Sequence, residues 1–309
     1  MTAAEQTSGV ITTLDELLHL RFLARRVTLF SRRRVHSHQL GPRLSHFRGR
    51  GMEFEEVRPY QPGDDIRLIN WQMTARMGRP FTKVYQEERE LPVHLLVDQS
   101  SSMYFGTRVA FKSVIAARIA ALLGWSALQH GDQVGGIVFN DYQYETIQPK
   151  RQRKTFLKLL STISHYSQQQ AQQQQAAQQN NLFSGIQRLS QQKTHGTLII
   201  LISDFINCHD ETLQHISQLA SKNRIMMYFV YDYLEYHVPD PNIYYISNGT
   251  EQATVNTQDQ TQANLYKACF QQRFDRIKKH CKKYNIGFTA VSSEDNLVQK
   301  LSRGGSDHG

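Results

Sequence analysis

The chain has 309 residues, which is enough for one large domain or for one domain with a substantial appendage. Apolar residues make up 39% and charged residues 20%, a globular composition, and the longest apolar runs, such as residues 198–202, are too short to span a bilayer. The 36 Lys and Arg outnumber the 27 Asp and Glu and give a net charge of +9. This charge is compatible with binding to nucleic acid, to an anionic membrane face or to an acidic protein partner, and it does not distinguish between them.

The N-terminal part combines a polar tail with a basic helical segment. Residues 1–12 lack the apolar segment of a signal peptide. The three cysteines lack the paired spacing of a metal site, and so small and odd a number indicates a reducing compartment, so we expect a cytoplasmic protein without a membrane span. Apolar residues at helical spacing predict a helix over residues 14–22, with Thr13 as N-cap and Glu16 completing a capping box. The arginines at 25–26 and 32–34 have few aromatic neighbours, so we expect them to face solvent or a protein partner rather than nucleic acid.

Residues 53–90 alternate opposite charges with aromatic residues, and such a segment cannot be buried unless its charges are paired. A turn is expected at 62–63, where proline precedes glycine. We predict short strands and turns packed against the following domain, with an ion-pair network formed by Arg58, Asp65, Arg67 and Arg76. A structural role for these carboxylates is favoured over a catalytic one.

The apolar run at 94–97 ends abruptly in Asp98, and two hydroxyls follow at alternate positions, Ser100 and Ser102. The run predicts a buried strand, which places all three side chains at its carboxyl end, where open α/β sheets bind ligands. Three such oxygen ligands suit Mg²⁺. The alternative is that Asp98 caps the next helix while the serines satisfy loop amides.

Strands and helices then alternate to the end of the chain, which predicts an α/β fold with a doubly wound, mostly parallel sheet covered on both faces. A second apolar strand, at 197–202, stops at Asp204, so Asp98 and Asp204 can project over the same sheet edge and strengthen the metal-site hypothesis. Residues 168–180 are nearly all Gln and Ala and form a low-complexity insertion. We expect further strands at 133–139, 142–147, 224–231 and 286–291, a hairpin near 242–256, and helices at 107–130, 154–166, 182–192, 211–222, 261–284 and from 293 onward.

Residues 51–79 contain Arg58-Pro59-Tyr60-x-Pro62-Gly63-Asp64-Asp65-x-Arg67-x-x-Asn70-Trp71 and then Ala75-Arg76. This long signature, rich in rare residues, resembles that of the DUF58 family, whose members carry a von Willebrand factor A-like domain. The strand end at Asp98 agrees with that domain. The resemblance divides the chain into a tail and basic helical segment (1–44), the signature region (45–91), a von Willebrand factor A-like α/β domain (92–303) and a tail (304–309).

The resemblance implies a metal-ion-dependent adhesion site that holds Mg²⁺, Mn²⁺ or Ca²⁺ through Asp98, Ser100, Ser102 and Asp204. The family's threonine ligand falls at Asn180, a departure in which an amide oxygen stands in for a hydroxyl. Relatives are commonly encoded beside MoxR-type AAA+ ATPases. The implied function is therefore a non-enzymatic adaptor, which acts with such an ATPase in assembling or activating protein complexes and whose metal binds a carboxylate of the partner.

Two other function classes stay open. An enzyme has little support, because the chain lacks a phosphate-binding loop, a nucleophile elbow and a paired-histidine zinc motif; a metal-dependent phosphatase is the enzyme class that remains. A nucleic-acid-binding protein would use the basic region near Arg32 and would show steep salt dependence.

Overall fold

The computed structural model describes residues 9–27, 52–87, 91–170, 182–192, 194–237, 240, 242–247 and 252–303. The chain divides into two compact units: Arg33–Glu90, and a larger unit made of Met1–Arg32 and Leu91–Gly309. The N-terminal helix therefore belongs to the same unit as the α/β sheet. Within the described ranges, no helix is both long enough and apolar enough to cross a membrane.

The larger unit is built on a six-stranded sheet, which confirms the predicted mostly parallel arrangement. The strand order is β10-β7-β6-β3-β4-β5, and every neighbouring pair is parallel except β4 and β5. The strands are β3 (Pro92–Asp98), β4 (Gln133–Phe139), β5 (Tyr144–Lys150), β6 (Leu198–Ser203), β7 (Arg224–Tyr231) and β10 (Gly287–Ser292). From β3 the chain adds β4 and β5 on one side and then returns to add β6 on the other. The strand order therefore reverses between β3 and β6, the position at which open α/β sheets bind ligands.

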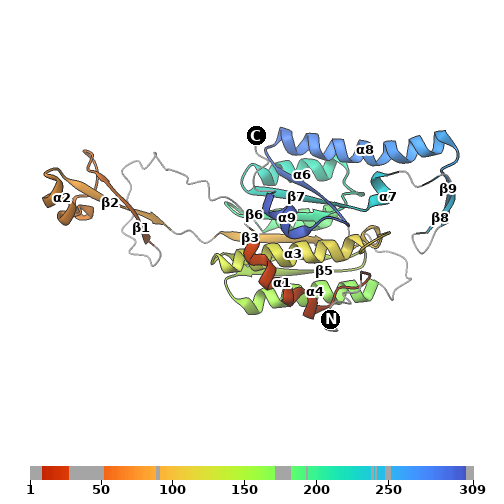
Figure 1. The fold of residues 1–309 in the computed structure, drawn as a ribbon, viewed down its shortest axis with the longest axis horizontal. Helices are drawn as coiled ribbons and strands as arrows, with labels where there is room; N and C mark the ends of the chain where they lie inside the picture. Colours follow the sequence, from red (N-terminus) through yellow and green to blue (C-terminus); the bar gives the residue numbers. More distant parts are fainter. Residues whose placement is uncertain are drawn as a thin grey trace. The chain divides into compact units, whose positions relative to one another are not determined.

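Helices cover both faces of this sheet (Figure 1). Successive side chains of a strand point to opposite faces, so Leu95 and Val97 of β3 enter one apolar core while Leu96 enters the other. The first core packs against α1, α3, α4 and α9, and the second packs against α5, α6 and α8. The bounds of these helices are α1 (Leu14–Leu23), α3 (Lys112–Gln129), α4 (Arg153–Gln170), α5 (Leu182–Gln191), α6 (Asp210–Ala220), α8 (Gln260–Lys283) and α9 (Leu297–Arg303).

Helix α1 has the predicted N-cap, because the Thr13 hydroxyl accepts a hydrogen bond from the backbone N–H of Glu16, whereas the Glu16 carboxylate pairs with Arg118 instead of completing a capping box. It packs against α3, where the indole N–H of Trp125 donates to the carbonyl of Leu17 at 3.0 Å. Short elements complete the unit: the 3₁₀ turns η1 (Ala24–Arg26) and η3 (Ser101–Met103), helix α7 (Tyr233–Tyr236), and the predicted hairpin of β8 (Ile243–Ser247) and β9 (Gln252–Asn256).

Several boundaries differ from the predicted ones, and the cause is tertiary contact. Helix α3 begins at Lys112 rather than near 107, because Thr107 donates its backbone N–H and its hydroxyl to Asp232, which holds this loop out of the helix. The last helix begins at Leu297 rather than near 293, because Ser292 and Asp295 close a turn ahead of it. Strand β5 runs from 144 to 150, shifted toward the C-terminus from the predicted 142–147.

The smaller unit contains β1 (Met52–Pro59) paired antiparallel with β2 (Phe81–Glu87), and the 3₁₀ turn η2 (Ile66–Leu68) and helix α2 (Trp71–Met77) between them. Short strands and turns were predicted here, but the helix was not. Its N-cap is Asn70, whose side-chain oxygen accepts from the N–H of Met73. It ends at Gly78 in the left-handed region, at φ 66°, where glycine is favoured.

The predicted ion-pair network of this unit is wrong, because its members do not pair with one another in the way that was predicted. The guanidinium of Arg58 pairs with Asp64, at 2.7 Å, and not with Asp65. Asp65 instead accepts the backbone N–H of Arg67, as an N-cap. Among the side chains that the structure describes, neither Arg67 nor Arg76 forms an ion pair. Asp64 and Asp65 each accept a backbone N–H group of this segment, from Gln61 and Arg67 respectively. Packing of the signature region against the sheet stays a prediction.

Close contact between β3 and β4 gives a stability prediction. A Cβ atom added at Gly136 of β4 would lie 1.9 Å from the backbone carbonyl oxygen of Leu95, an atom that cannot move without distorting β3. We expect Gly136→Ala to lower the free energy of unfolding by about 2–3 kcal/mol, measured by urea denaturation. The matched control is Gly196→Ala, where φ is +66° and nothing lies within 4 Å of the added atom; it should cost about 1 kcal/mol. Equal losses in both variants would contradict the close contact.

Candidate functional site

The carboxyl end of β3 holds a buried carboxylate that anchors hydroxyl groups. One oxygen of Asp98 accepts the backbone N–H of Ser100 at 2.9 Å and its hydroxyl at 2.6 Å, and the other accepts the hydroxyl of Ser203 at 2.5 Å. Asp98 is 4% exposed and Ser100 is 6% exposed. Each serine gives its proton to Asp98, so its hydroxyl oxygen has lone pairs that can accept; the oxygen of Ser203 already accepts the backbone N–H of Phe205 at 3.0 Å. Asp98 therefore orients hydroxyl oxygens that can act as metal ligands, and its own carboxylate is a metal-binding group of the same kind.

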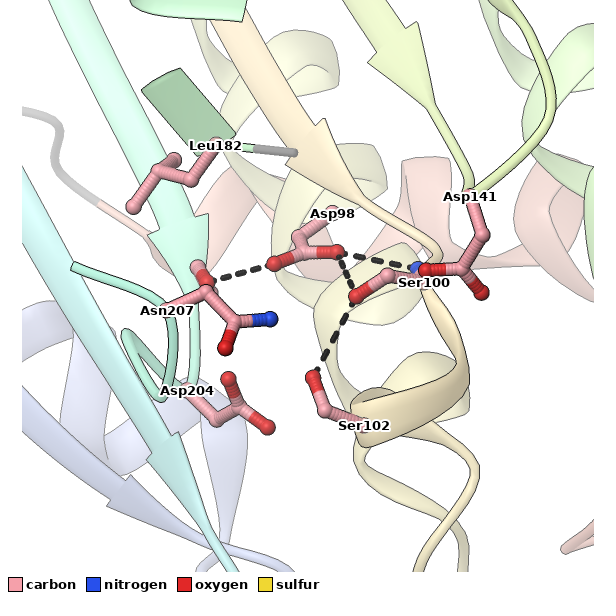
Figure 2. Close-up of a pocket in the computed structure, with 8 residues that line it drawn as sticks. Asp98, Ser100, Ser102, Asp141, Leu182, Asp204 and Asn207 are labelled. Carbon is pink, nitrogen blue, oxygen red and sulfur yellow. Dashed lines mark hydrogen bonds between the residues drawn. The ribbon is translucent and has the colours of Figure 1, made fainter. Parts of the chain in front are cut away.

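The loop after β3 adds a third hydroxyl. The turn η3 closes with the N–H of Met103 on the carbonyl of Ser100, and it brings the Ser102 hydroxyl to 3.2 Å from that of Ser100. Asp141, from the β4–β5 hairpin, accepts the backbone N–H of Ser101 at 2.7 Å and so fixes the loop from the other side. Figure 2 shows four of these side chains close together at the carboxyl end of β3: Asp98, Ser100, Ser102 and Asp141.

The second buried carboxylate enters from the end of β6. Asp204 is 1% exposed, and one of its oxygens accepts the N–H of Ile206 at 3.1 Å. Phe205, next in the chain, has a φ of 52°, a left-handed conformation that is rare for a side chain of this size. The chain turns sharply there, and Asn207 comes to line the same cavity as Asp204.

These residues surround a small cavity at the reversal of strand order. It offers about 20 Å³ to the centre of a water-sized sphere, which is room for a single water molecule or ion. Seven of its eight lining residues carry a side-chain oxygen, and Leu182 at the start of α5 is the exception. The lining residues are Asp98, Ser100, Ser102, Asp141, Leu182, Ser203, Asp204 and Asn207.

A buried lysine lies beside the cavity. Lys112, the first residue of α3, is 1% exposed, and its ammonium donates to Asp204 at 2.8 Å and to Glu235 of α7 at 2.9 Å. Glu235 also lies 3.5 Å from the guanidinium of Arg273. The positive charge of Lys112 therefore balances the negative charge of Asp204, and Asp98 has no paired cation among the described residues.

The charges of the site are coupled. Burial, and then the negative charge of Asp204, raises the pKa of Asp98 to about 7, although hydrogen bonds from Ser100 and Ser203 oppose this shift. Burial also acts to raise the pKa of Asp204, but the charge of Lys112 and its hydrogen bond outweigh burial and hold this pKa below its ordinary value. Burial is the larger cause, so the raised pKa of Asp98 reflects a carboxyl group held away from water beside a second carboxylate.

A third strand-end carboxylate shows what a purely structural aspartate looks like in this fold. Asp232, after β7, is 0% exposed and accepts the backbone N–H groups of Thr107 and Leu234 and the hydroxyls of Thr107 and Ser293. These donors engage both of its oxygens and tie the loop before α3 to the ends of β7 and β10. Asp232 does not line the cavity. Asp232 thus accepts four hydrogen bonds, whereas Asp98 accepts three and Asp204 accepts two from the described residues.

The structure brings together Asp98, Ser100, Ser102 and Asp204, as expected from the strand ends. Asn180 lies outside the described residues. Sequence reasoning missed Asp141, Ser203, Asn207 and Lys112. The one available signal was the Asn140-Asp141 turn that joins two predicted strands beside β3, which places its side chains at the same sheet edge.

The donor set fits a hard divalent cation. Carboxylate, hydroxyl and amide oxygens are the ligands of Mg²⁺, Mn²⁺ and Ca²⁺, and neither histidine nor cysteine lines the cavity. In the part of the chain that the structure describes, no group of three or more His, Cys, Asp or Glu residues is placed to hold a metal. Serine hydroxyls are therefore indispensable to any metal site here, and Asp98 orients two of the three that line the cavity.

Comparison with known proteins identifies the family. A family model described as "Protein of unknown function DUF58" matches residues 56–276, which is more than half of the chain. The uncharacterized protein Rv1480 of Mycobacterium tuberculosis and the uncharacterized protein Mb1516 of Mycobacterium bovis are each 27% identical to the chain over 200 residues. The alignments cover 65% of this chain and 61% of the relatives, so the chain spans less than two thirds of their length. With this match and the signature in its smaller unit, the chain belongs to the DUF58 family.

Proposed function

We propose that this protein is a metal-dependent adaptor, in which a von Willebrand factor A-like domain uses a divalent cation to bind a carboxylate of a protein partner. The observation that carries the proposal is the set of serine hydroxyls that Asp98 holds around a cavity at the reversal of strand order. Ser100, Ser102 and Asp204 would hold Mg²⁺ or Mn²⁺, and Asp98 would hold the hydroxyls in place. The cation would supply an open coordination position for an incoming carboxylate.

The residues of the chain support binding rather than bond cleavage. The hydroxyl of Ser100 donates to Asp98, and no histidine lines the cavity to act as a base for a nucleophile. With room for a single ion, the cavity leaves no space to enclose a substrate, so a ligand must approach from solvent. Following the family resemblance, we propose a MoxR-type AAA+ ATPase as the partner.

Metal binding is tested first, by titrating Mn²⁺ into the purified protein in a calorimeter. We expect saturable binding in the wild type and a loss of affinity of about 10- to 100-fold in Asp98→Ala, because groups that orient metal ligands typically contribute that much. Ser100→Ala should show a similar loss. Ser101→Ala is the matched control, since Ser101 belongs to the same loop but does not line the cavity. Unchanged affinity in Asp98→Ala and Ser100→Ala would refute the site.

Partner binding is tested next, by capturing the MoxR-type ATPase of the same organism on the immobilised protein. We expect capture in Mg²⁺, loss of capture in a chelator, and loss in Asp98→Ala. Capture that is indifferent to the chelator would contradict a metal-mediated contact. Turnover of a phosphate ester that disappears in Asp98→Ala would instead favour the hydrolase alternative.

A further inference from the structure

We propose that Lys112 is a resident cation that competes with a divalent ion for Asp204 and so sets how weakly the cavity holds its metal. This inference rests on the proposed metal-dependent function and concerns the regulation of the same site. It is carried by two hydrogen bonds from one fully buried ammonium group, to Asp204 and to Glu235.

Both carboxylate oxygens of Asp204 already accept a hydrogen bond. One oxygen accepts from Lys112 at 2.8 Å and the other accepts from the N–H of Ile206. A divalent cation near Asp204 must therefore share this carboxylate with the ammonium. Both side chains are almost completely buried, at 1% and 2% exposed, so water screens the repulsion between the two cations poorly. Lys112 consequently lowers the affinity of the cavity for a metal.

Glu235 is a second hydrogen-bond acceptor for the ammonium group of Lys112. It lies in α7, at the edge of the site, and its other oxygen accepts the backbone N–H of Asp232. The guanidinium of Arg273 helps to hold it, at 3.5 Å. When a metal takes Asp204, the ammonium can stay paired with Glu235 without leaving the protein interior. This second partner makes competition feasible, because neither state leaves a buried charge unpaired.

The competition links metal occupancy to partner binding. With Lys112 paired to Asp204, a divalent ion in the cavity is held by less carboxylate charge than the cavity would otherwise supply. A carboxylate from the partner can supply that charge and fill the ion's open coordination position. The partner should therefore raise the affinity for the metal, and the metal should raise the affinity for the partner by the same factor.

The experiment measures Mn²⁺ affinity by calorimetry in the full chain and in three variants. Lys112→Gln removes the charge but keeps a donor for the carboxylates, and we expect it to bind Mn²⁺ about tenfold more tightly than the wild type. Glu235→Gln should act in the opposite direction and bind several-fold more weakly, because Lys112 is then left to Asp204 alone. Arg118→Met is the matched control: Arg118 also lies in α3 and pairs with Glu16, away from the cavity. It should leave the affinity unchanged while lowering thermal stability.

The outcomes separate this inference from the proposed function. Mn²⁺ binding that is lost in Asp98→Ala but is equal or weaker in Lys112→Gln would overturn the role of Lys112 and leave the metal site standing. Absence of Mn²⁺ binding in every variant would overturn both. If Lys112→Gln does not fold, Glu235→Gln decides the question, since unchanged or tighter binding in that variant contradicts the competition.

Discussion

Replacing Lys112 with methionine should lower the free energy of unfolding by about 3–5 kcal/mol, the range for removing one partner of a buried ion pair. Burial by itself lowers the pKa of Lys112, but the charges of Asp204 and Glu235 outweigh burial and raise this pKa above its ordinary value, so the lysine is charged in the folded protein. Without it, the buried Asp204 and the partly buried Glu235 lose their common donor. Urea denaturation at neutral pH in a chelator measures the loss.

The matched control for this variant is Arg108→Met. Arg108 also precedes the body of α3 and pairs with a carboxylate, Glu294 at 2.8 Å, but the two side chains are 51% and 34% exposed. Exposed pairs contribute at most about 1 kcal/mol, so this variant should stay close to the wild type. Saturating Mn²⁺ should stabilise Lys112→Met more than it stabilises the wild type or Arg108→Met, because the variant without the lysine binds the ion more tightly. A loss below 1 kcal/mol in Lys112→Met would show that the buried carboxylates do not depend on the lysine.

Acidification should destabilise the protein through His94, by about 3 kcal/mol between pH 7 and pH 4. His94 lies in β3 and is 5% exposed, and burial lowers its pKa from 6.5 to about 4. The unfolded chain therefore binds the proton more tightly than the folded protein. The contribution is fully present above pH 6.5 and is lost as the pH falls from 6.5 toward 4. Urea denaturation at a series of pH values measures it.

The variant that isolates this effect is His94→Gln, which removes the titrating ring while keeping a polar side chain of similar length. Between pH 7 and pH 4 its stability should fall by about 3 kcal/mol less than that of the wild type. The exposed His19, whose side chain is 70% accessible to solvent, supplies the control His19→Gln, which should follow the wild type. Parallel pH profiles for wild type and His94→Gln would refute a neutral, buried His94.

The sequence by itself determined the sheet and the two strand ends that form the site. Apolar runs bounded by turn residues mark β3 and β6, and each run stops at an aspartate, so Asp98 and Asp204 are placed at a sheet edge without any knowledge of strand order. Ser100 and Ser102 follow at alternate positions in the same loop, and their approach to Asp98 is local. These features depend on residues close together in the chain.

Only the tertiary structure decided which charges meet. Lys112 falls inside the helix predicted from 107, where a lysine is ordinarily exposed, yet it is buried against partners that lie 92 and 123 residues away in the chain. The same holds for Thr107 and Asp232, whose contact across 125 residues moved the start of α3. Such pairs depend on the order in which strands join the sheet. Hydrophobic periodicity indicates which face a residue occupies but not which neighbour it meets, so the cation beside the cavity was visible only after the chain was folded.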